Sequence, residues 1–165
     1  MAEDGSNGQE GLAAGQPGIS VVAQYVKDFS FENPGAPETL RPRGTSPNIG
    51  VSVGVSPRPI GENQVEVELR LEARATDSET TLFAIELVYA GLFRLANVTQ
   101  ETINPIMLIE CPRLLFPFAR QIIASASQAG GFPPLLLDPI DFVALYRQRM
   151  ANPGASGATA QPPAN

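Results

Sequence analysis

The sequence predicts an α+β fold: a four-stranded antiparallel sheet with a crossover loop, followed by a long helix and a shorter C-terminal helix. Apolar and polar residues alternate strictly through 64–75, which is typical of a strand with one face in water. Three neighbouring segments show similar alternation, and two stretches nearer the C-terminus show helical spacing with proline at or near their starts. Strands that precede helices in this way define the α+β class.

The four strands are predicted at residues 19–32, 48–56, 64–75 and 80–95. The polar turn "TDSE" joins the last two into a hairpin, and four consecutive strands suggest a meander-like sheet. In the first strand, alternation puts Tyr25, Phe29 and Phe31 on one face and Val26, Asp28, Ser30 and Glu32 on the other. The proline-rich segment 33–47 is too long for a tight turn, so we expect it to cross the surface or an edge.

The helices are expected within 102–131 and over 138–150. In the first stretch, a short helical turn leads into a long helix with Pro112 near its first position, where proline is tolerated. Pro117 lies too deep for that rule and should kink the helix or shift its start. An apolar loop follows, and Asp138 is the expected cap of the last helix.

Both flanks of the long helix are apolar or small, which indicates burial against two partners. The flanks are Leu114, Phe118, Ile122 and Ser125 on one side, and Leu115, Ala119, Ile123 and Ala126 on the other. Four strands and two helices leave little to cover both, so an oligomer interface is favoured over a helix buried in its own fold. The small residues of "ASAS", 124–127, would let another helix approach closely.

Composition excludes several kinds of chemistry. The 165 residues include no histidine and one cysteine, so Cys/His and Ser/His/Asp catalysis, paired-cysteine zinc sites and internal disulfides are absent. Cys111 could be an activated thiol at a helix start or a packing residue, and the apolar surroundings favour packing. Carboxylate chemistry at Glu66, Glu68 or Glu72 stays open, but these lie among exposed charges, so we predict no enzyme and no cofactor.

The ends of the chain differ from its middle. Residues 1–17 and 151–165 lack the apolar side chains needed to offset ordering, so both tails are predicted to be disordered around a domain at 18–150. A net charge of −6 argues against nucleic acid and anionic membrane partners. There is no signal-peptide pattern and no apolar run long enough to span a bilayer, so we expect a soluble cytoplasmic protein.

Two surfaces are candidates for binding. Parity places Asp28, Glu32 and Glu86 on the polar face of the sheet beside aliphatic neighbours, which suggests docking of a basic, amphipathic partner; a merely solvated face is the alternative. Apolar residues of the crossover, including Leu40, could form a groove with Phe132 and the leucines at 135–137. An extended segment could bind there through its backbone and alternate side chains.

The quoted segments "YVKDFSFENPGAP" (25–37), "ELVYAGLFRL" (86–95) and "ECPRLLFPFARQIIASASQAGGFPPLLLDPIDFVALY" (110–146) strongly resemble the SecB family of protein-export chaperones. The resemblance spans roughly 19–150. It implies a homotetramer, a dimer of dimers, that holds unfolded secretory precursor proteins without ATP and delivers them to the SecA motor. It also implies that the long helix lies between dimers, through Leu114, Phe118, Ile122, Ser125 and Ala126.

The resemblance further implies site residues. The positions that match the SecA contact are Asp28, Glu32, Ala84 and Glu86, and a bulkier aliphatic is usual at Ala84. Candidates for the client groove are Phe31, Leu40, Phe132, Leu135, Leu137, Phe142 and Tyr146. The uncharged tail 151–165 departs from the family's SecA-contacting C-terminus, so that role is not transferred. A carrier of small hydrophobic ligands is the alternative function.

Overall fold

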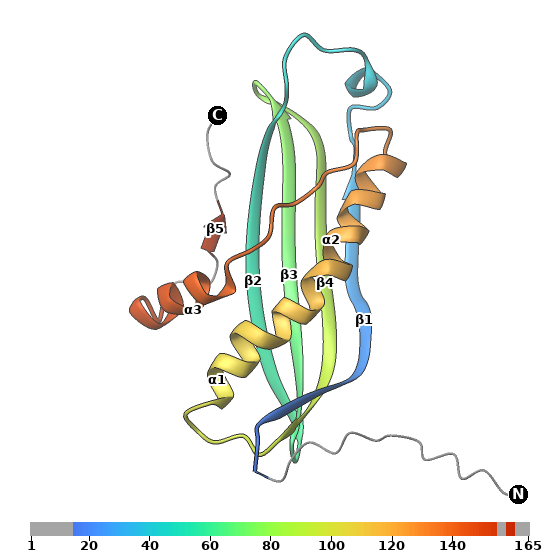
Figure 1. Cartoon of the computed structure of the whole chain (residues 1–165). Coiled ribbons are helices and arrows are strands. Elements are labelled where there is room, and N and C mark those ends of the chain that lie inside the picture. Colours follow the sequence, from blue (N-terminus) through green and yellow to red (C-terminus); the bar gives the residue numbers. More distant parts are fainter. Residues whose placement is uncertain (1–14, 155–157, 161–165) are drawn as a thin grey trace, which may run out of the picture.

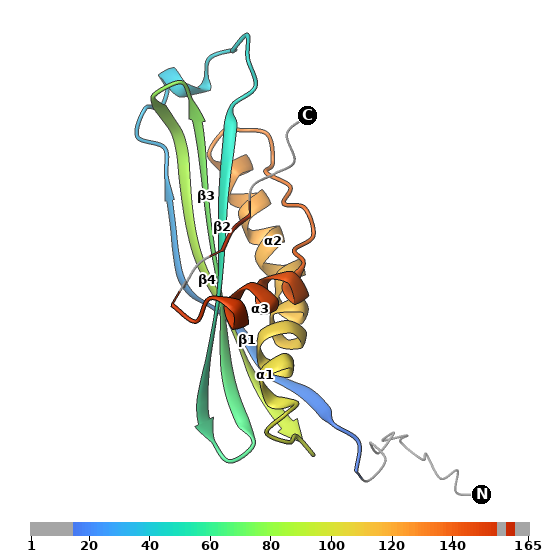
Figure 2. The same ribbon diagram turned by 90° about the vertical axis from the view of Figure 1, so that its left-hand side faces the viewer.

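A computed structural model describes residues 15–154 and 158–160 of the chain. A long, twisted antiparallel sheet forms one layer, and helix α2 lies diagonally across one of its faces (Figures 1 and 2). The opposite face carries no helix in the described residues and is called the open face below. Both predicted layers, the sheet and the helices that follow it, are therefore confirmed.

The sheet contains β1 (Gly18–Glu32), β2 (Asn48–Gly61), β3 (Gln64–Asp77), β4 (Thr80–Ala96) and the short β5 (Ala158–Ala160), in the order β1-β4-β3-β2-β5. The meander is confirmed only for β2 to β4. β1 pairs with β4 instead of β2, so the expectation of a simple four-strand meander is wrong. The segment 33–47 is long because it must carry the chain across the end of β4 and β3 to the far side of the sheet (Figure 1).

Two bulges in β1 change which side chains share a face. The register with β4 shifts between Val21 and Ala23 and again between Val26 and Asp28. The extra residue, Lys27, reverses the parity that simple alternation predicts. Tyr25 therefore lies on the open face with Asp28, while Phe29 lies on the face that α2 occupies, and the prediction that the two rings share a face is wrong.

The long helix has no break at its prolines. α1 (Ile103–Pro105), a π-helical turn (Ile106–Glu110) and α2 (Cys111–Ala129) follow one another directly. Pro112 has no N–H to bond four residues back, and the preceding turn is wide, with the Cys111 N–H bonding the Ile106 carbonyl. Pro117 lies inside α2 on its exposed side and does not shift the start, so that alternative is wrong.

The core lies between α2 and the central strands. Leu115, Ala119 and Ile123 of α2 are fully buried against the inward side chains of β3 and β4. Gly91 of β4 lets the helix come close, because a Cβ there would lie 2.6 Å from the Phe93 ring and 2.8 Å from a Leu115 methyl group. The predicted burial of one helix flank is thus confirmed.

The last helix starts later than predicted. α3 (Phe142–Ala151) begins after Asp141, whose carboxylate accepts a hydrogen bond from the Ala144 N–H at 3.0 Å, so Asp138 is not its cap. Leu137 and Phe142 are both buried. Residues 138–141 between them are not helical, and this extended stretch lets both side chains enter the core. Ser127 of α2 holds the loop that leads to α3, because its buried Oγ accepts a hydrogen bond from the Leu135 N–H at 2.8 Å.

The predicted tails fall largely outside the described residues, at 1–14, 155–157 and 161–165. Two parts of the predicted tail 151–165 have regular structure. Ala151 is the last residue of α3, and Ala158–Ala160 pair with Val51–Val53 of β2. No helix in residues 15–154 has both the length and the apolar character that crossing a bilayer requires.

Candidate binding surfaces

Three carboxylates come together on the open face. Asp28 lies opposite Val88, Glu32 lies opposite Ala84, and Glu86 lies opposite Ser30, which stands between the two acids of β1. The register between Asp28 and Glu32 has no bulge, so Asp28, Glu32 and Glu86, called the acidic trio below, share one face as predicted. All three are exposed, and within the described residues none forms an ion pair.

A shallow hollow of about 180 Å³ adjoins the acidic trio. Its lining includes Gly50, Glu72, Arg74, Ala84 and Glu86. Ala84 is half-buried, and its small side chain helps to leave this space open where the resemblance leads one to expect a bulkier residue. The surface around the trio therefore combines negative charge with a dip that an apolar or basic side chain can enter.

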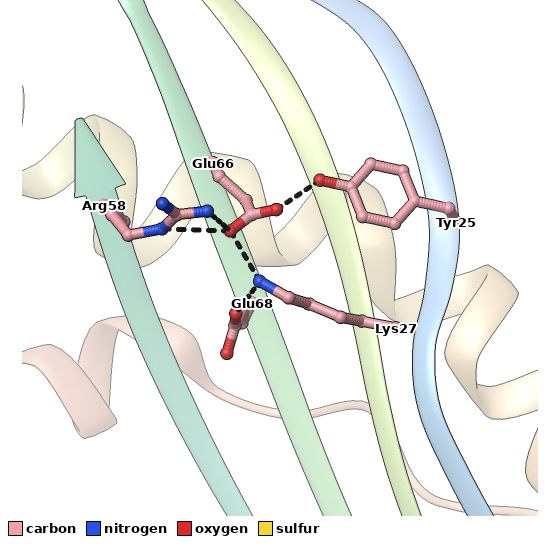
Figure 3. Close-up of polar contacts among 5 residues, drawn as sticks. All are labelled: Tyr25, Lys27, Arg58, Glu66 and Glu68. Carbon is pink, nitrogen blue, oxygen red and sulfur yellow. Dashed lines mark hydrogen bonds and ion pairs between the residues drawn. The ribbon is translucent and has the colours of Figure 1, made fainter. Parts of the chain in front are cut away.

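A second polar cluster lies further along the same face, shown in Figure 3. Glu66 of β3 accepts hydrogen bonds from the Tyr25 hydroxyl, from Lys27 Nζ at 2.8 Å and from Arg58 Nη2 at 2.7 Å. Lys27 also bonds Glu68 at 2.5 Å. Tyr25, Lys27, Arg58, Glu66 and Glu68 are called the Glu66 cluster, and they join β1, β2 and β3. The side chains from β1 pass over β4 at Ala90, which is fully buried.

The Glu66 cluster holds its central carboxylate ionised. Hydrogen bonds from Lys27, Tyr25 and Arg58 lower the pKa of Glu66 from 4.5 to about 2, against the opposing effect of burial. Glu66 itself is only 5% exposed, although its neighbours Lys27 and Arg58 are exposed charges, as expected. A carboxylate without a proton near neutral pH, with its oxygens occupied by three donors, is a structural group and a poor general acid.

The crossover end of the molecule gathers three of the predicted client residues. Phe31 stacks on Phe83 with ring centroids 6.0 Å apart, and Phe83 lies 4.8 Å from Phe132. Leu40 covers Gly131 and is 43% exposed. We call Phe31, Leu40, Phe83 and Phe132 the crossover cluster, an aromatic wall with an exposed aliphatic rim.

The other predicted client residues lie elsewhere. Leu135 is half-buried in the loop after α2. Leu137 and Phe142 are buried in the core, where Phe142 packs edge-on to Phe116, so neither presents its side chain to a partner in this structure. Tyr146 of α3 lines a hollow of about 790 Å³ beside β2. The structure therefore brings Phe31, Leu40 and Phe132 together and leaves the remaining four apart from them.

The outward face of α2 is apolar and uncovered. Leu114 is 44% and Phe118 51% exposed, Ser125 is exposed, and Ile122 and Ala126 are partly buried against the core. Within "ASAS", however, Ala124 and Ser127 are buried inside the chain, so only part of that segment is available to another helix. Four apolar residues of β1 (Val21, Val22, Val26 and Phe29) are also exposed. Simple alternation does not predict them, because the two bulges change the parity of the strand.

Cys111 is a packing residue. It is fully buried, and desolvation, with a smaller effect from Glu110, raises the pKa of its thiol to about 12. A neutral, inaccessible thiol is not a nucleophile. Over the described part of the chain, cysteine and acidic side chains nowhere gather in threes in a way that could hold a metal ion.

The fold carries two separate exposed surfaces, one apolar and one acidic, and no catalytic constellation in the described residues. Comparison with known proteins gives its family. The model of the family "Preprotein translocase subunit SecB" matches residues 13–153. A protein-export protein SecB of Rhodopseudomonas palustris is 54% identical over 144 residues, which are 87% of this chain and 91% of the relative. The corresponding protein of Methylocella silvestris is 54% identical over 156 residues, 94% and 96% of the two chains.

The chain belongs to the SecB family, and this membership gives it a chaperone role in protein export. Among solved structures, it shares its fold with a SecB-like chaperone of Mycobacterium tuberculosis, solved in complex with a ChAD peptide from an antitoxin. That match has a TM-score of 0.62 and 12% identity, and covers 74% of this chain and 90% of the other.

Proposed function

We propose that the protein is an ATP-independent holdase that binds unfolded secretory precursors in the cytoplasm, keeps them competent for export and delivers them to SecA. The crossover cluster carries the proposal, because it presents apolar side chains at the surface of a small acidic protein. Its aromatic rings are anchored in the core through Phe83, while Leu40 is open to solvent. Such a surface suits unfolded chains, which still expose their own apolar residues. The chaperone unit is residues 18–150.

Holding requires no nucleotide, because it works by mass action. A protein that binds only the unfolded form of a client shifts the client's folding equilibrium away from the native state. The acidic surface would also raise the rate of capture for clients with basic side chains. Each apolar contact of a few hundred Å² is weak by itself, so repeated sites in an oligomer would supply avidity of about 10²–10⁴-fold.

Refolding kinetics test the holdase. An excess of the protein should delay refolding of a slow-folding precursor in the absence of nucleotide. Leu40→Ser should weaken the delay, whereas Ile60→Ser, at a similarly exposed aliphatic near the β2–β3 turn, should leave it unchanged. Unchanged refolding with the wild-type protein would refute the proposal. If Leu40→Ser and Ile60→Ser changed the delay equally, the crossover cluster would not be the client-binding surface.

The acidic trio is the proposed SecA contact, with Ala84 as the apolar member beside it. Glu86→Lys reverses the charge at the centre of the trio and should weaken binding to SecA by on the order of tenfold, while client holding stays intact. Glu79→Lys makes the same charge change in the exposed β3–β4 turn and serves as the matched control. SecA affinity that survives Glu86→Lys, or falls equally in Glu79→Lys, would contradict this assignment.

The exposed face of α2 is the proposed interface of a homotetramer built as a dimer of dimers. Leu114 and Phe118 leave large apolar side chains uncovered on a helix whose other flank is buried, which is what an interface between copies needs. Light scattering should give a tetrameric mass, and Phe118→Asp should reduce it to that of a dimer. A monomeric wild-type protein would refute this interface.

A carrier of small hydrophobic ligands is not favoured by the structure. The hollow beside β2 is open and includes Arg70, Glu72, Gln148 and Arg149 in its lining, whereas a lipid-like ligand requires an enclosed apolar cavity.

A further inference from the structure

The outer edge of β2 is only partly paired. β2 runs from Asn48 to Gly61 and pairs with β3 over nearly its whole length, but on its other side, within residues 15–154 and 158–160, it pairs only at Val51–Val53. An edge strand presents a row of free N–H and C=O groups, to which another extended chain can add. In a protein that handles unfolded chains, such an edge needs an explanation.

Two groups of the chain itself occupy part of that edge. Ala158–Ala160 lie antiparallel to Val51–Val53 as β5. Two residues further along β2, Arg149 of α3 donates from Nη1 to the Val55 carbonyl at 2.9 Å, in place of the N–H of a neighbouring strand. One contact is backbone and the other is a side chain, and together they cover adjoining positions of one edge.

The hollow of about 790 Å³ described above lies at this same edge. Its lining takes in Ser52–Ser56 of β2, Tyr146 and Arg149 of α3, and Asn152–Gly154, which lead away from α3. The space is thus bounded by the strand edge on one side and by the C-terminal part of the chain on the other. It adjoins Tyr146, one of the residues proposed for client contact.

The segment that pairs with this edge, β5, is short. β5 is three residues long and consists of alanine, threonine and alanine, so pairing contributes a few backbone hydrogen bonds and no large apolar side chain. Arg149 is exposed, and its bond to Val55 lies at the surface. A longer extended segment with bulky alternate side chains would form more backbone bonds along β2 and would also bury apolar area, so it would replace this occupant.

We propose that β5 and Arg149 act as a built-in competitor for the β2 edge. They cover the strand while no client is present and are displaced by the main chain of an extended, weakly charged polypeptide with alternating apolar side chains. The inference rests on the proposed holdase function and adds its regulation. While the competitor is bound, the site is unavailable, so the apparent dissociation constant of a client rises in inverse proportion to the free fraction of the site.

The test uses full-length protein with Ala160→Pro. The Val55 carbonyl faces the outer edge of β2, so Val51 and Val53 face that edge too, and their partners Ala160 and Ala158 direct their N–H groups at β2. The substitution removes one of these two N–H groups and leaves the rest of the chain unchanged. A labelled 15-residue peptide with alternating leucine and serine should bind the variant about three- to tenfold more tightly in anisotropy titrations. Hydrogen exchange should show faster exchange at Val51–Val53 in the free variant, and added peptide should restore protection there.

Arg149→Ala should act in the same direction, whereas Arg147→Ala, a change at another exposed arginine of α3, should have no effect on peptide affinity. A chain ending after Ala151 provides a second route to the loss of β5. Unchanged or weaker peptide binding in both Ala160→Pro and the shortened chain would overturn the inference. If the wild-type protein still arrested refolding in that case, only the competitor at the β2 edge would be refuted and the holdase function would be supported. If the wild-type protein failed to arrest refolding, the holdase function itself would be refuted.

Discussion

Replacing Glu66 by glutamine should destabilise the protein near neutral pH and matter much less in acid. The substitution keeps the size of the side chain but removes the charge that Tyr25, Lys27 and Arg58 surround. It leaves the acidic trio, the crossover cluster and α2 unchanged. The predicted effect is therefore one of stability, with a dependence on pH that few other substitutions in this chain would produce.

The magnitude follows from the lowered pKa. A fall from 4.5 to about 2 corresponds to at most ~3 kcal/mol of stabilisation at neutral pH. Lys27 and Arg58 have side chains that are 38% and 62% exposed, so solvent screens part of their attraction. We therefore expect a loss of about 1–2 kcal/mol in the free energy of unfolding for Glu66→Gln at pH 7.

The sign of the pH dependence is fixed by the direction of the pKa change. Because the folded pKa is below the unfolded value, the stabilisation is fully present above the unfolded value of 4.5 and is lost as pH falls toward about 2. Glutamine does not titrate. The difference between wild type and variant should therefore shrink by roughly half between pH 7 and pH 3.

Urea unfolding followed by far-UV circular dichroism measures this difference, since the chain has no tryptophan for a fluorescence signal. Protein concentration is held constant across variants, because association would contribute to apparent stability. Glu68→Gln is the matched control, with a single donor, Lys27, and a much smaller expected loss. If the difference in free energy of unfolding between wild type and Glu66→Gln stayed constant or grew on acidification, the ionised Glu66 would not be what stabilises the fold.

Three further outcomes are expected. Cys111, buried with a thiol pKa near 12, should resist iodoacetamide at pH 8 in the native protein and react once urea unfolds it; rapid native labelling would contradict its burial. Gly91→Ala should cost about 1–3 kcal/mol in urea unfolding, because the new Cβ meets the Phe93 ring and Leu115, whereas a neutral result would mean that α2 can shift outward. Asp141→Ala should cost about 0.5–2 kcal/mol through the lost cap of α3, with Asp138→Ala as a near-silent control.

Periodicity predicted the elements of this fold well, because strands and helices bury one face at a regular interval. The third strand starts at Gln64 as predicted, and the carboxylates of the acidic trio share a face because no bulge separates Asp28 from Glu32. Pairing is a different matter. Nothing in the local pattern of β1 shows that it pairs with β4, since that choice depends on where the crossover carries the chain.

The errors have local physical causes. An extra residue at Lys27 reverses the parity of β1, and alternation alone cannot locate an insertion of one residue in an otherwise regular strand. Pro117 is accommodated on the exposed side of α2, where a lost backbone hydrogen bond can be replaced by water. The Glu66 cluster depends on strands far apart in sequence, so charges that look solvated in the sequence become partners in the fold.

The small size of Ala90 has an effect well beyond its own position. Its methyl group takes up little room on the open face, so Tyr25 and Lys27 of β1 can pass over β4 and bond Glu66 of β3. These side chains link β1 to β3, although the backbones of the two strands do not pair. β1 also carries Asp28 and Glu32. Direct backbone pairing of β1 with β4 sets the spacing of those two acids relative to Glu86. A bulkier side chain at position 90 would therefore weaken the ionic contacts between β1 and β3 and leave the register of the acidic trio intact.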